Sequence, residues 1–156
     1  MTRPLYALPR NQRLTPALYT TLGQSCYFTI CAASQLSPFG EGRFAGIAVD
    51  CLVGQQSKSG CRLDVYCVMP NHIHVIVTPI LEGSSSLLYI DRFKGSCGRE
   101  MRLAGWTGKV WQGRSYDRVV RNDQSLHEIA RYILANPIRK GLCEHVDDYP
   151  WSGISN

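Results

Sequence analysis

The chain has 156 residues, of which 44% are hydrophobic and 19% charged, and its formal net charge is +5 at pH 7. This length and composition are typical of one globular domain with a sizeable core, and they exclude a disordered or fibrous chain. The sequence has no apolar run long enough for a membrane span and no secretion-signal pattern at its basic N-terminus, so we expect a cytoplasmic protein that does not bind a membrane.

The cysteines predict no covalent framework. The chain has seven of them, an odd number, and none forms a Cys-x-x-Cys pair. This arrangement argues against both a set of disulfides and a structural zinc site. We therefore expect reduced thiols, most of them buried.

The first half of the chain predicts an arm followed by alternating elements. Residues 1–24 are rich in proline and arginine and predict an irregular basic N-terminal arm ahead of a folded domain over residues 25–156. Aromatic and β-branched residues predict a strand over residues 24–33. Apolar residues at helical spacing favour a helix over residues 40–57, and residues 55–60 predict a polar turn.

The second half predicts a hairpin, two helices and a short strand region. Residues 62–69 alternate in polarity and lead through Pro70-Asn71 into another strand, which predicts an antiparallel hairpin. A serine cluster predicts a helix up to about Leu103, and residues 110–120 predict one or two short strands. The last helix is expected to begin near Ser125, with Glu128 completing a capping box. This order of elements predicts an α+β fold, one antiparallel sheet with helices on one side.

The most informative run is Met-Pro-Asn-His-Ile-His-Val-Ile-Val-Thr, residues 69–78. Alternate side chains of a strand share a face, and the rise is about 3.3 Å per residue, so His72 and His74 start about 6 to 7 Å apart. Both rings can therefore reach one metal ion, while Ile73, Val75 and Val77 form the opposite, buried face. A strand histidine is more often a core or surface residue than a ligand, so the pair by itself leaves both interpretations open.

A basic segment runs from residue 91 to residue 121. It contains eight basic and three acidic residues and so carries a charge of +5. Such a segment favours a polyanion such as nucleic acid, although a solvated charged face is the plain alternative. Trp111 lies among these cations and could stack on an unpaired base or be a core aromatic. The candidate phosphate contacts are Arg92, Arg99, Arg102, Arg114, Arg118 and Arg121.

The last helix carries two polar residues at the margin of its apolar stripe. Tyr132 and Asn136 are one helical turn apart. Pro137 removes an amide and crowds a carbonyl, so we expect the helix to stop or kink there and to leave Asn136 at a helix end. A helical tyrosine is usually a packing residue and an asparagine before proline a terminator, so neither residue indicates a function alone.

The ordered set of these motifs resembles the single-tyrosine HUH transposases, and within them the REP-associated tyrosine transposases. The resemblance covers roughly residues 26–152, and its most specific parts are the Met-Pro-Asn-His-x-His and Tyr-Ile-x-x-Asn-Pro runs. The other matching runs are Trp111-Gln112, Arg139-Lys140-Gly141-Leu142 and Asp148-Tyr149-Pro150-Trp151-Ser152. The resemblance implies a ferredoxin-like HUH endonuclease fold, with residues 25–156 as the catalytic domain.

The resemblance also implies a chemistry for these residues. His72, His74 and Asn136 would bind a divalent metal, Mg²⁺ or Mn²⁺, and Tyr132 would attack a DNA phosphodiester. The products would be a 5′-phosphotyrosyl enzyme and a free 3′-hydroxyl, and a second strand could reverse the step without a nucleotide cofactor. The implied partner is single-stranded or hairpin DNA of the REP type, bound by a protein that is expected to be a monomer.

Several alternatives stay open from the sequence. Tyr116 also lies among cations and is the rival nucleophile, and Glu128 could tune the tyrosine instead of capping the helix. The chain could be a catalytically inert protein that binds hairpin DNA. It could also be a metal-dependent phosphoesterase that uses water as its nucleophile.

Overall fold

The computed structural model describes residues 13–33, 36–113 and 115–154. Its elements in chain order are α1 (Pro16–Thr20), β1 (Cys26–Cys31), η2 (Pro38–Gly40), α2 (Gly42–Gly54), α3 (Gln56–Ser59), β2 (Cys61–Met69), β3 (His72–Pro79), α4 (Ser86–Leu103), β4 (Tyr116–Val119), α5 (Asp123–Arg139), η3 (Val146–Asp148) and β5 (Ser152–Ile154). The order and type of the main elements agree with the sequence prediction. In the described part of the chain, no helix is long and apolar enough to cross a membrane.

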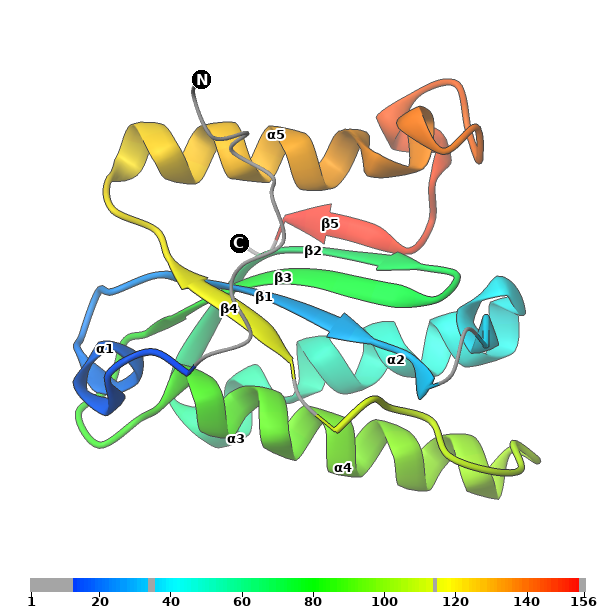
Figure 1. Cartoon of the computed structure of the whole chain (residues 1–156), viewed down its shortest axis with the longest axis horizontal. Coiled ribbons are helices and arrows are strands. Elements are labelled where there is room, and N and C mark those ends of the chain that lie inside the picture. The colour runs from blue at the N-terminus through cyan, green and yellow to red at the C-terminus, as the bar shows by residue number, and fades with distance from the viewer. Residues whose placement is uncertain (1–12, 34–35, 114, 155–156) are drawn as a thin grey trace.

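The strands form one five-stranded sheet in the order β4-β1-β3-β2-β5, and every pair of neighbours is antiparallel (Figure 1). The hairpin of β2 and β3 is confirmed, with Met69 opposite His72 and Cys67 opposite His74. Strand β3 is central, so its backbone amides and carbonyls have partners on both sides. The two histidines of the Met-Pro-Asn-His-Ile-His run are therefore on a strand that is hydrogen bonded on both sides.

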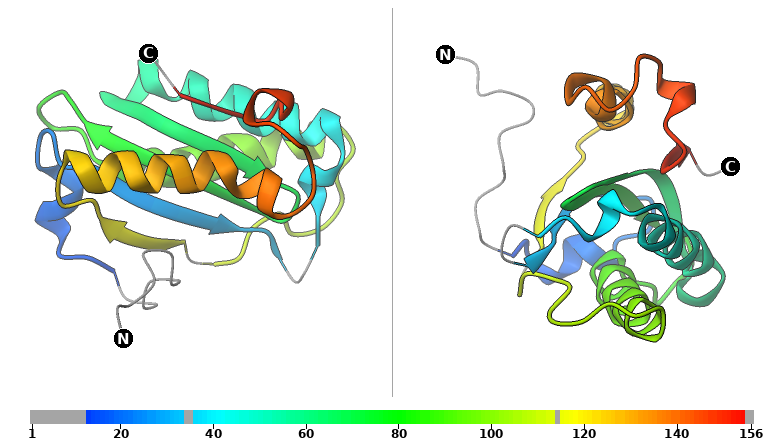
Figure 2. Two further views of the ribbon diagram at one scale, coloured as in Figure 1. Left: turned by 90° about the horizontal axis from the view of Figure 1, so that it is seen from above. Right: turned by 90° about the vertical axis from the view of Figure 1, so that its right-hand side faces the viewer.

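Helices cover both faces of this sheet, so the expectation of helices on one side was wrong. Helices α2 and α4 pack under one face, and α5 lies across the other (Figures 1 and 2). The physical reason lies in strand β3, which is buried on both faces. Ile73 and Val75 belong to the core between the sheet and helices α2 and α4, whereas Ile76 packs with Ile129 and Ile133 of α5.

The core between the sheet and α2 determines which face of α2 is buried. In α2 the buried side chains Phe44, Ala45, Ala48 and Leu52 follow the spacing of one helical face, as the sequence predicted. Residues 55–60 were expected to be a polar turn, but residues 56–59 form the short helix α3. Gly60, with φ of +65°, ends this helix in the left-handed conformation that glycine adopts without strain.

Helix α5 begins and ends differently from the prediction. The side chain of Asn122 accepts a hydrogen bond from the amide of Ser125 and caps the helix, so the expected capping box of Ser125 and Glu128 does not form. The helix also continues through Pro137 to Arg139, and the amide of Lys140 donates to the carbonyl of Asn136. Burial of Pro137 against the sheet holds this last turn, and a proline φ is compatible with helix.

The predicted N-terminal arm falls partly outside the described residues, which begin at residue 13. Within the arm, residues 16–20 form the short helix α1 and Tyr19 is buried. The Tyr19 hydroxyl donates to Asp117 of β4 at 2.6 Å, and Arg13 forms an ion pair with the same carboxylate at 3.0 Å. This part of the arm is therefore tied to the edge of the sheet.

Candidate active site

The two histidines of β3 point to the face of the sheet that α5 covers. Thr29 of β1 lies opposite His74 on one side and Cys67 of β2 on the other, and all three belong to the α5 face. The imidazole rings meet edge to face with their centres 4.6 Å apart, and the two Nε2 atoms are 3.0 Å apart. The prediction that the two imidazoles lie side by side on one face of the strand is confirmed.

Each imidazole is held by a hydrogen bond at its other nitrogen. The Nδ1 atom of His72 lies 2.7 Å from Oδ1 of Asn71, the preceding residue. The Nδ1 atom of His74 lies 2.8 Å from the hydroxyl of Tyr27 and 3.4 Å from that of Thr29. Both Nε2 atoms are thus left to face a shared point, as metal-binding histidines require.

Burial keeps both rings neutral. It lowers the pKa of His72 to about 4, with a smaller contribution from the charge of Lys140. It lowers the pKa of His74 to about 3, and the neighbouring His72 and Arg139 act in the same direction. A neutral imidazole has a free nitrogen lone pair, so the pair can act as a ligand set at neutral pH.

Helix α5 brings Tyr132 to the same place. Its ring centre lies 6.5 Å from that of His74, at a steep angle. Arg139 lies over the phenol ring, with its guanidinium carbon 3.8 Å from the ring centre, and donates to the Tyr132 carbonyl at 2.7 Å. The structure therefore joins two residues of β3 to a tyrosine about sixty positions later in the chain.

Asn136 lies one turn after Tyr132 and is 4% exposed. It shares its buried side of α5 with Ile129, Ile133 and Pro137, which is the side that packs on the sheet. The expectation that a broken helix end frees this side chain was wrong, because Asn136 lies inside the helix. Its location comes instead from the packing of α5 across the sheet.

The donor set fits a divalent ion with octahedral geometry. Ligands at about 2.1 Å from such an ion lie about 3.0 Å apart when they are adjacent, which matches the separation of the two Nε2 atoms. Within the residues that the structure describes, no group of three or more His, Cys, Asp or Glu side chains could hold a metal. The third ligand expected from the sequence, the amide oxygen of Asn136, is a neutral oxygen donor and comes from the buried side of α5.

The predicted phosphate contacts divide between the two faces. Arg92, Arg99 and Arg102 are on α4, beneath the sheet and away from the histidines. Arg99 is paired with its neighbour Glu100 at 3.1 Å. A strand bound at the histidines would have to wrap around the sheet to reach these three side chains.

The other predicted arginines follow the edge of the sheet. Arg118 of β4 lies opposite Tyr27 and so projects toward the α5 face, where its charge acts on the Tyr27 hydroxyl. Arg121 is exposed in the connection from β4 to α5. Arg114 falls outside the described residues.

Trp111 does not lie on a surface that could stack bases. It is 9% exposed, and its ring packs between Phe39 and Phe93 with centre distances of 5.5 and 5.6 Å. Its indole nitrogen donates to the carbonyl of Lys94 at 2.9 Å. The core alternative is therefore correct for this residue, because a bridge with Ala32 turns it toward α4.

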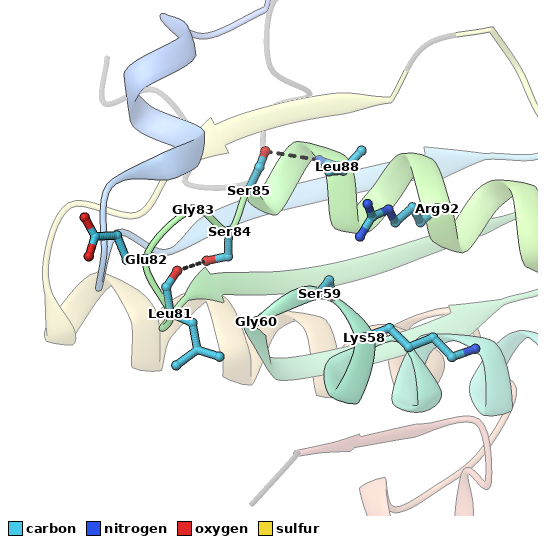
Figure 3. A pocket seen from close by; sticks show the side chains of 10 residues that line it. All are labelled: Lys58, Ser59, Gly60, Leu81, Glu82, Gly83, Ser84, Ser85, Leu88 and Arg92. Carbon is cyan, nitrogen blue, oxygen red and sulfur yellow. Dashed lines mark hydrogen bonds between the residues drawn. The ribbon is translucent and has the colours of Figure 1, made fainter.

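Arg92 lines a separate hollow of about 270 Å³ at the start of α4, shared with Lys58 (Figure 3). The serine hydroxyls that line it are already used by the backbone. Ser84 donates to the carbonyl of Leu81, and Ser85 caps α4 by accepting from the amide of Leu88. The hollow is thus accounted for by the turn and the helix cap, and it does not include the histidines.

Tyr116, the rival nucleophile, is on the same face but farther away. It lies opposite Thr29 of β1, so one whole strand separates it from His74. Glu128 is exposed on α5 and accepts a hydrogen bond from Gln124 at 3.5 Å. Of the two candidate nucleophiles, Tyr132 is therefore the one whose ring lies next to His74.

Sequence reasoning missed four residues of the site: Tyr27, Thr29, Asn71 and Arg139. Tyr27 and Thr29 alternate along β1, but nothing in the sequence says that β1 pairs with β3. Asn71 and Arg139 stand inside the quoted motifs, next to His72 and just after Asn136. Their proximity in sequence was the available signal.

Comparison with known proteins finds relatives in the same family that the sequence motifs resemble. No protein-family model matches the chain. A REP-associated tyrosine transposase of Escherichia coli K12 is 30% identical over 96 residues, which cover 58% of this chain and 53% of that protein. A Haemophilus influenzae relative named in the same family is 26% identical over 98 residues, with 56% of each chain covered. The chain thus spans about half the length of the curated relatives it matches.

A solved structure gives the same result for the fold. It is that of a REP-associated tyrosine transposase bound to a REP hairpin, and it superposes with a TM-score of 0.74 at 20% sequence identity. The match covers 90% of this chain and 81% of the other. The chain is therefore similar in sequence to the REP-associated tyrosine transposases and shares their α+β fold, as the ordered motifs predicted.

Proposed function

We propose that the chain is a metal-dependent endonuclease and strand-transfer enzyme that cuts and rejoins single-stranded DNA beside hairpins of the REP type. The observation that carries this proposal is the meeting of His72, His74 and Tyr132. Strand β3 supplies two neutral imidazoles whose Nε2 atoms are 3.0 Å apart, and α5 supplies a phenol whose ring centre is 6.5 Å from that of His74. A nucleophile beside an ion site is the arrangement that attack on a phosphodiester needs.

The chemistry assigned to the site is a transesterification. The phenol oxygen of Tyr132 forms a bond to the scissile phosphorus, and the bond from phosphorus to the 3′ oxygen breaks. The phenol proton is lost to solvent, and the departing oxygen takes up a proton to become a 3′-hydroxyl. Attack by another 3′-hydroxyl on the phosphotyrosine reverses these changes and joins a new strand, so no nucleotide is consumed.

The residues around Tyr132 support this step by charge and by position. Arg139 stacks on the phenol ring, which fixes the ring, and places a positive charge beside it. Lys140 and Arg118 act electrostatically on His72 and Tyr27, so they too lie near the site. These cations would favour a bound phosphate and stabilise the negative charge that builds up during attack.

A Mg²⁺ or Mn²⁺ ion held by His72, His74 and Asn136 would polarise a non-bridging phosphate oxygen. The mixed nitrogen and oxygen donors, without a thiolate, suit these hard ions. Both histidines are held in place by hydrogen bonds at Nδ1, which limits the reorganisation on binding.

The test is a search for the covalent adduct. A hairpin strand labelled on the 3′ side of the cut is incubated with protein and Mn²⁺, and the products are separated on a denaturing gel. We expect a slower protein band that carries the label and requires Mn²⁺. It should be absent from Tyr132→Phe and His72→Ala and present in Tyr116→Phe.

The same gel separates the alternatives. Cleavage without an adduct would support a phosphoesterase that uses water. DNA that stays uncleaved and free of adduct on this gel, but is retarded by the protein on a native gel, would support an inert hairpin-binding protein. An adduct that survives in Tyr132→Phe and disappears in Tyr116→Phe would assign the nucleophile to β4.

A further inference from the structure

The metal-free histidine pair needs one proton between its rings. Its two Nε2 atoms are 3.0 Å apart, and two bare lone pairs at that distance would repel each other. Asn71 Oδ1 accepts from Nδ1 of His72, so the Nε2 of His72 carries no proton. The bridging proton therefore belongs to Nε2 of His74, which leaves Nδ1 of His74 as an acceptor.

Binding of a metal ion would require the opposite tautomer of His74. A metal takes the lone pairs of both Nε2 atoms, so neither can keep a proton. His72 already has the correct tautomer, because its proton is on Nδ1. His74 must move its proton from Nε2 to Nδ1, and that proton then needs an acceptor inside the fold.

The hydroxyl of Tyr27 is the group that can serve both forms. It lies 2.8 Å from Nδ1 of His74, with the hydroxyl of Thr29 at 3.4 Å from the same nitrogen. A hydroxyl can donate to Nδ1 in the metal-free form and accept from it in the metal-bound form. Carboxylates and backbone carbonyls, the usual partners of ligating histidines, can only accept.

We propose that Tyr27, assisted by Thr29, is a positioning residue that holds His74 in either tautomer and so sets the affinity of the site for its metal. The inference rests on the proposed function, since it takes the histidine pair to be the metal site. The number of bound protons does not change: His74 loses the proton at Nε2 and gains one at Nδ1, while the Tyr27 hydroxyl turns toward Thr29.

Burial makes this hydroxyl indispensable. Tyr27, Thr29 and His74 are 7%, 4% and 7% exposed, so bulk water has little access to Nδ1 as a substitute partner. Burial also raises the pKa of Tyr27 to about 12, although a hydrogen bond with Thr29 opposes the shift. The phenol therefore keeps its proton at neutral pH and can either donate or accept a hydrogen bond.

Calorimetric titration with Mn²⁺ tests the inference. Tyr27→Phe should bind Mn²⁺ about 10 to 100 times more weakly than the unchanged chain, in the range of other partners of metal-bound histidines. Tyr149→Phe is the matched control. It also removes a partly buried tyrosine hydroxyl, but one that donates to the carbonyl of Val68. Equal Mn²⁺ affinity in Tyr27→Phe and the unchanged chain would overturn the proposal.

A spectroscopic readout covers the case in which Tyr27→Phe does not fold. Nitrogen NMR of the unchanged chain, labelled at histidine, reports the tautomer of each ring. We expect the His74 proton on Nε2 without metal and on Nδ1 with Mg²⁺. The same tautomer in both conditions would overturn the proposal.

The inference and the proposed function fail in different ways. Tyr132→Phe should lose the DNA adduct and keep its Mn²⁺ affinity. If metal binding depends on Tyr27 but no adduct forms with any strand, the inference stands and the nuclease proposal falls. If the adduct forms and Tyr27→Phe binds Mn²⁺ normally, the nuclease proposal stands and the inference falls.

Discussion

Arg139 lies over the ring of Tyr132, with its guanidinium carbon 3.8 Å from the ring centre and Nη2 donating to the Tyr132 carbonyl. The stack fixes the phenol and supplies a charge that a developing phosphoryl anion would meet. We expect Arg139→Met to slow adduct formation about 10 to 100-fold. Arg139→Lys keeps the charge without the planar guanidinium, so its rate of adduct formation should lie between those of Arg139→Met and the unchanged chain.

Single-turnover adduct formation with saturating hairpin DNA measures this effect. Urea unfolding of each variant checks that the loss is not one of stability. An unchanged rate in Arg139→Met would show that the stack has no part in the reaction.

The pH dependence of stability follows from the buried histidines. Their folded pKa values, about 4 for His72 and about 3 for His74, lie below the ordinary value of 6.5. The unfolded chain therefore binds more protons below pH 6.5. The stabilising contribution is complete above pH 6.5 and is lost as the pH falls toward 4, by about 2 kcal/mol per histidine between pH 6.5 and 5.

Urea unfolding in metal-free buffer at pH 7 and pH 5 measures this loss. The double variant His72→Gln, His74→Gln should have a smaller difference between the two pH values than the unchanged chain. His127→Gln, at an exposed position of α5, is the control. The same difference in the double variant as in the unchanged chain would contradict the prediction.

The salt dependence of DNA binding tests which face of the sheet contacts the DNA. Arg118 projects toward the α5 face, whereas Arg99 is on α4 beneath the opposite face. We expect Arg118→Gln to weaken hairpin binding and to reduce the slope of log affinity against log salt concentration by about 1. Arg99→Gln should leave both unchanged, and the reverse result would place the DNA on the α2 and α4 side.

Trp111 gives a prediction about stability instead of binding. Its ring fills the core between Phe39 and Phe93. Trp111→Ala should lower the free energy of unfolding by about 3 to 5 kcal/mol. Trp111→Phe keeps most of the volume and should fold and bind hairpin DNA with unchanged affinity, measured by fluorescence anisotropy. A large loss of DNA affinity in folded Trp111→Phe would restore the stacking role.

Mixing two inactive variants tests whether one chain supplies the whole site. His72, His74 and Tyr132 meet within a single chain, so we expect the proposed reaction to need no second copy. An equimolar mixture of Tyr132→Phe and His72→Ala should therefore form no adduct. Recovery of about a quarter or more of the normal yield would indicate a site shared between two copies.

The local patterns were predictable and the long-range packing was not. Alternation of apolar residues gave the strand with His72 and His74, and helical spacing gave α5 with Tyr132. Helices on one side were expected because the sequence does not say which apolar face meets which. Pro137 is expected from its chemistry to stop or kink the helix, but α5 continues through the buried Pro137 to Arg139.

The sequence by itself determined the chemistry that is present: two imidazoles that share a strand face, and a tyrosine and asparagine one helical turn apart. Periodicity fixes such relations because strand and helix geometry are local. Only the tertiary structure decided that α5 crosses the histidine face, that Trp111 is core, and that Tyr27 and Arg139 complete the site. Those contacts depend on the pairing of β1 with β3 and on the packing of α5, which join residues far apart in the chain.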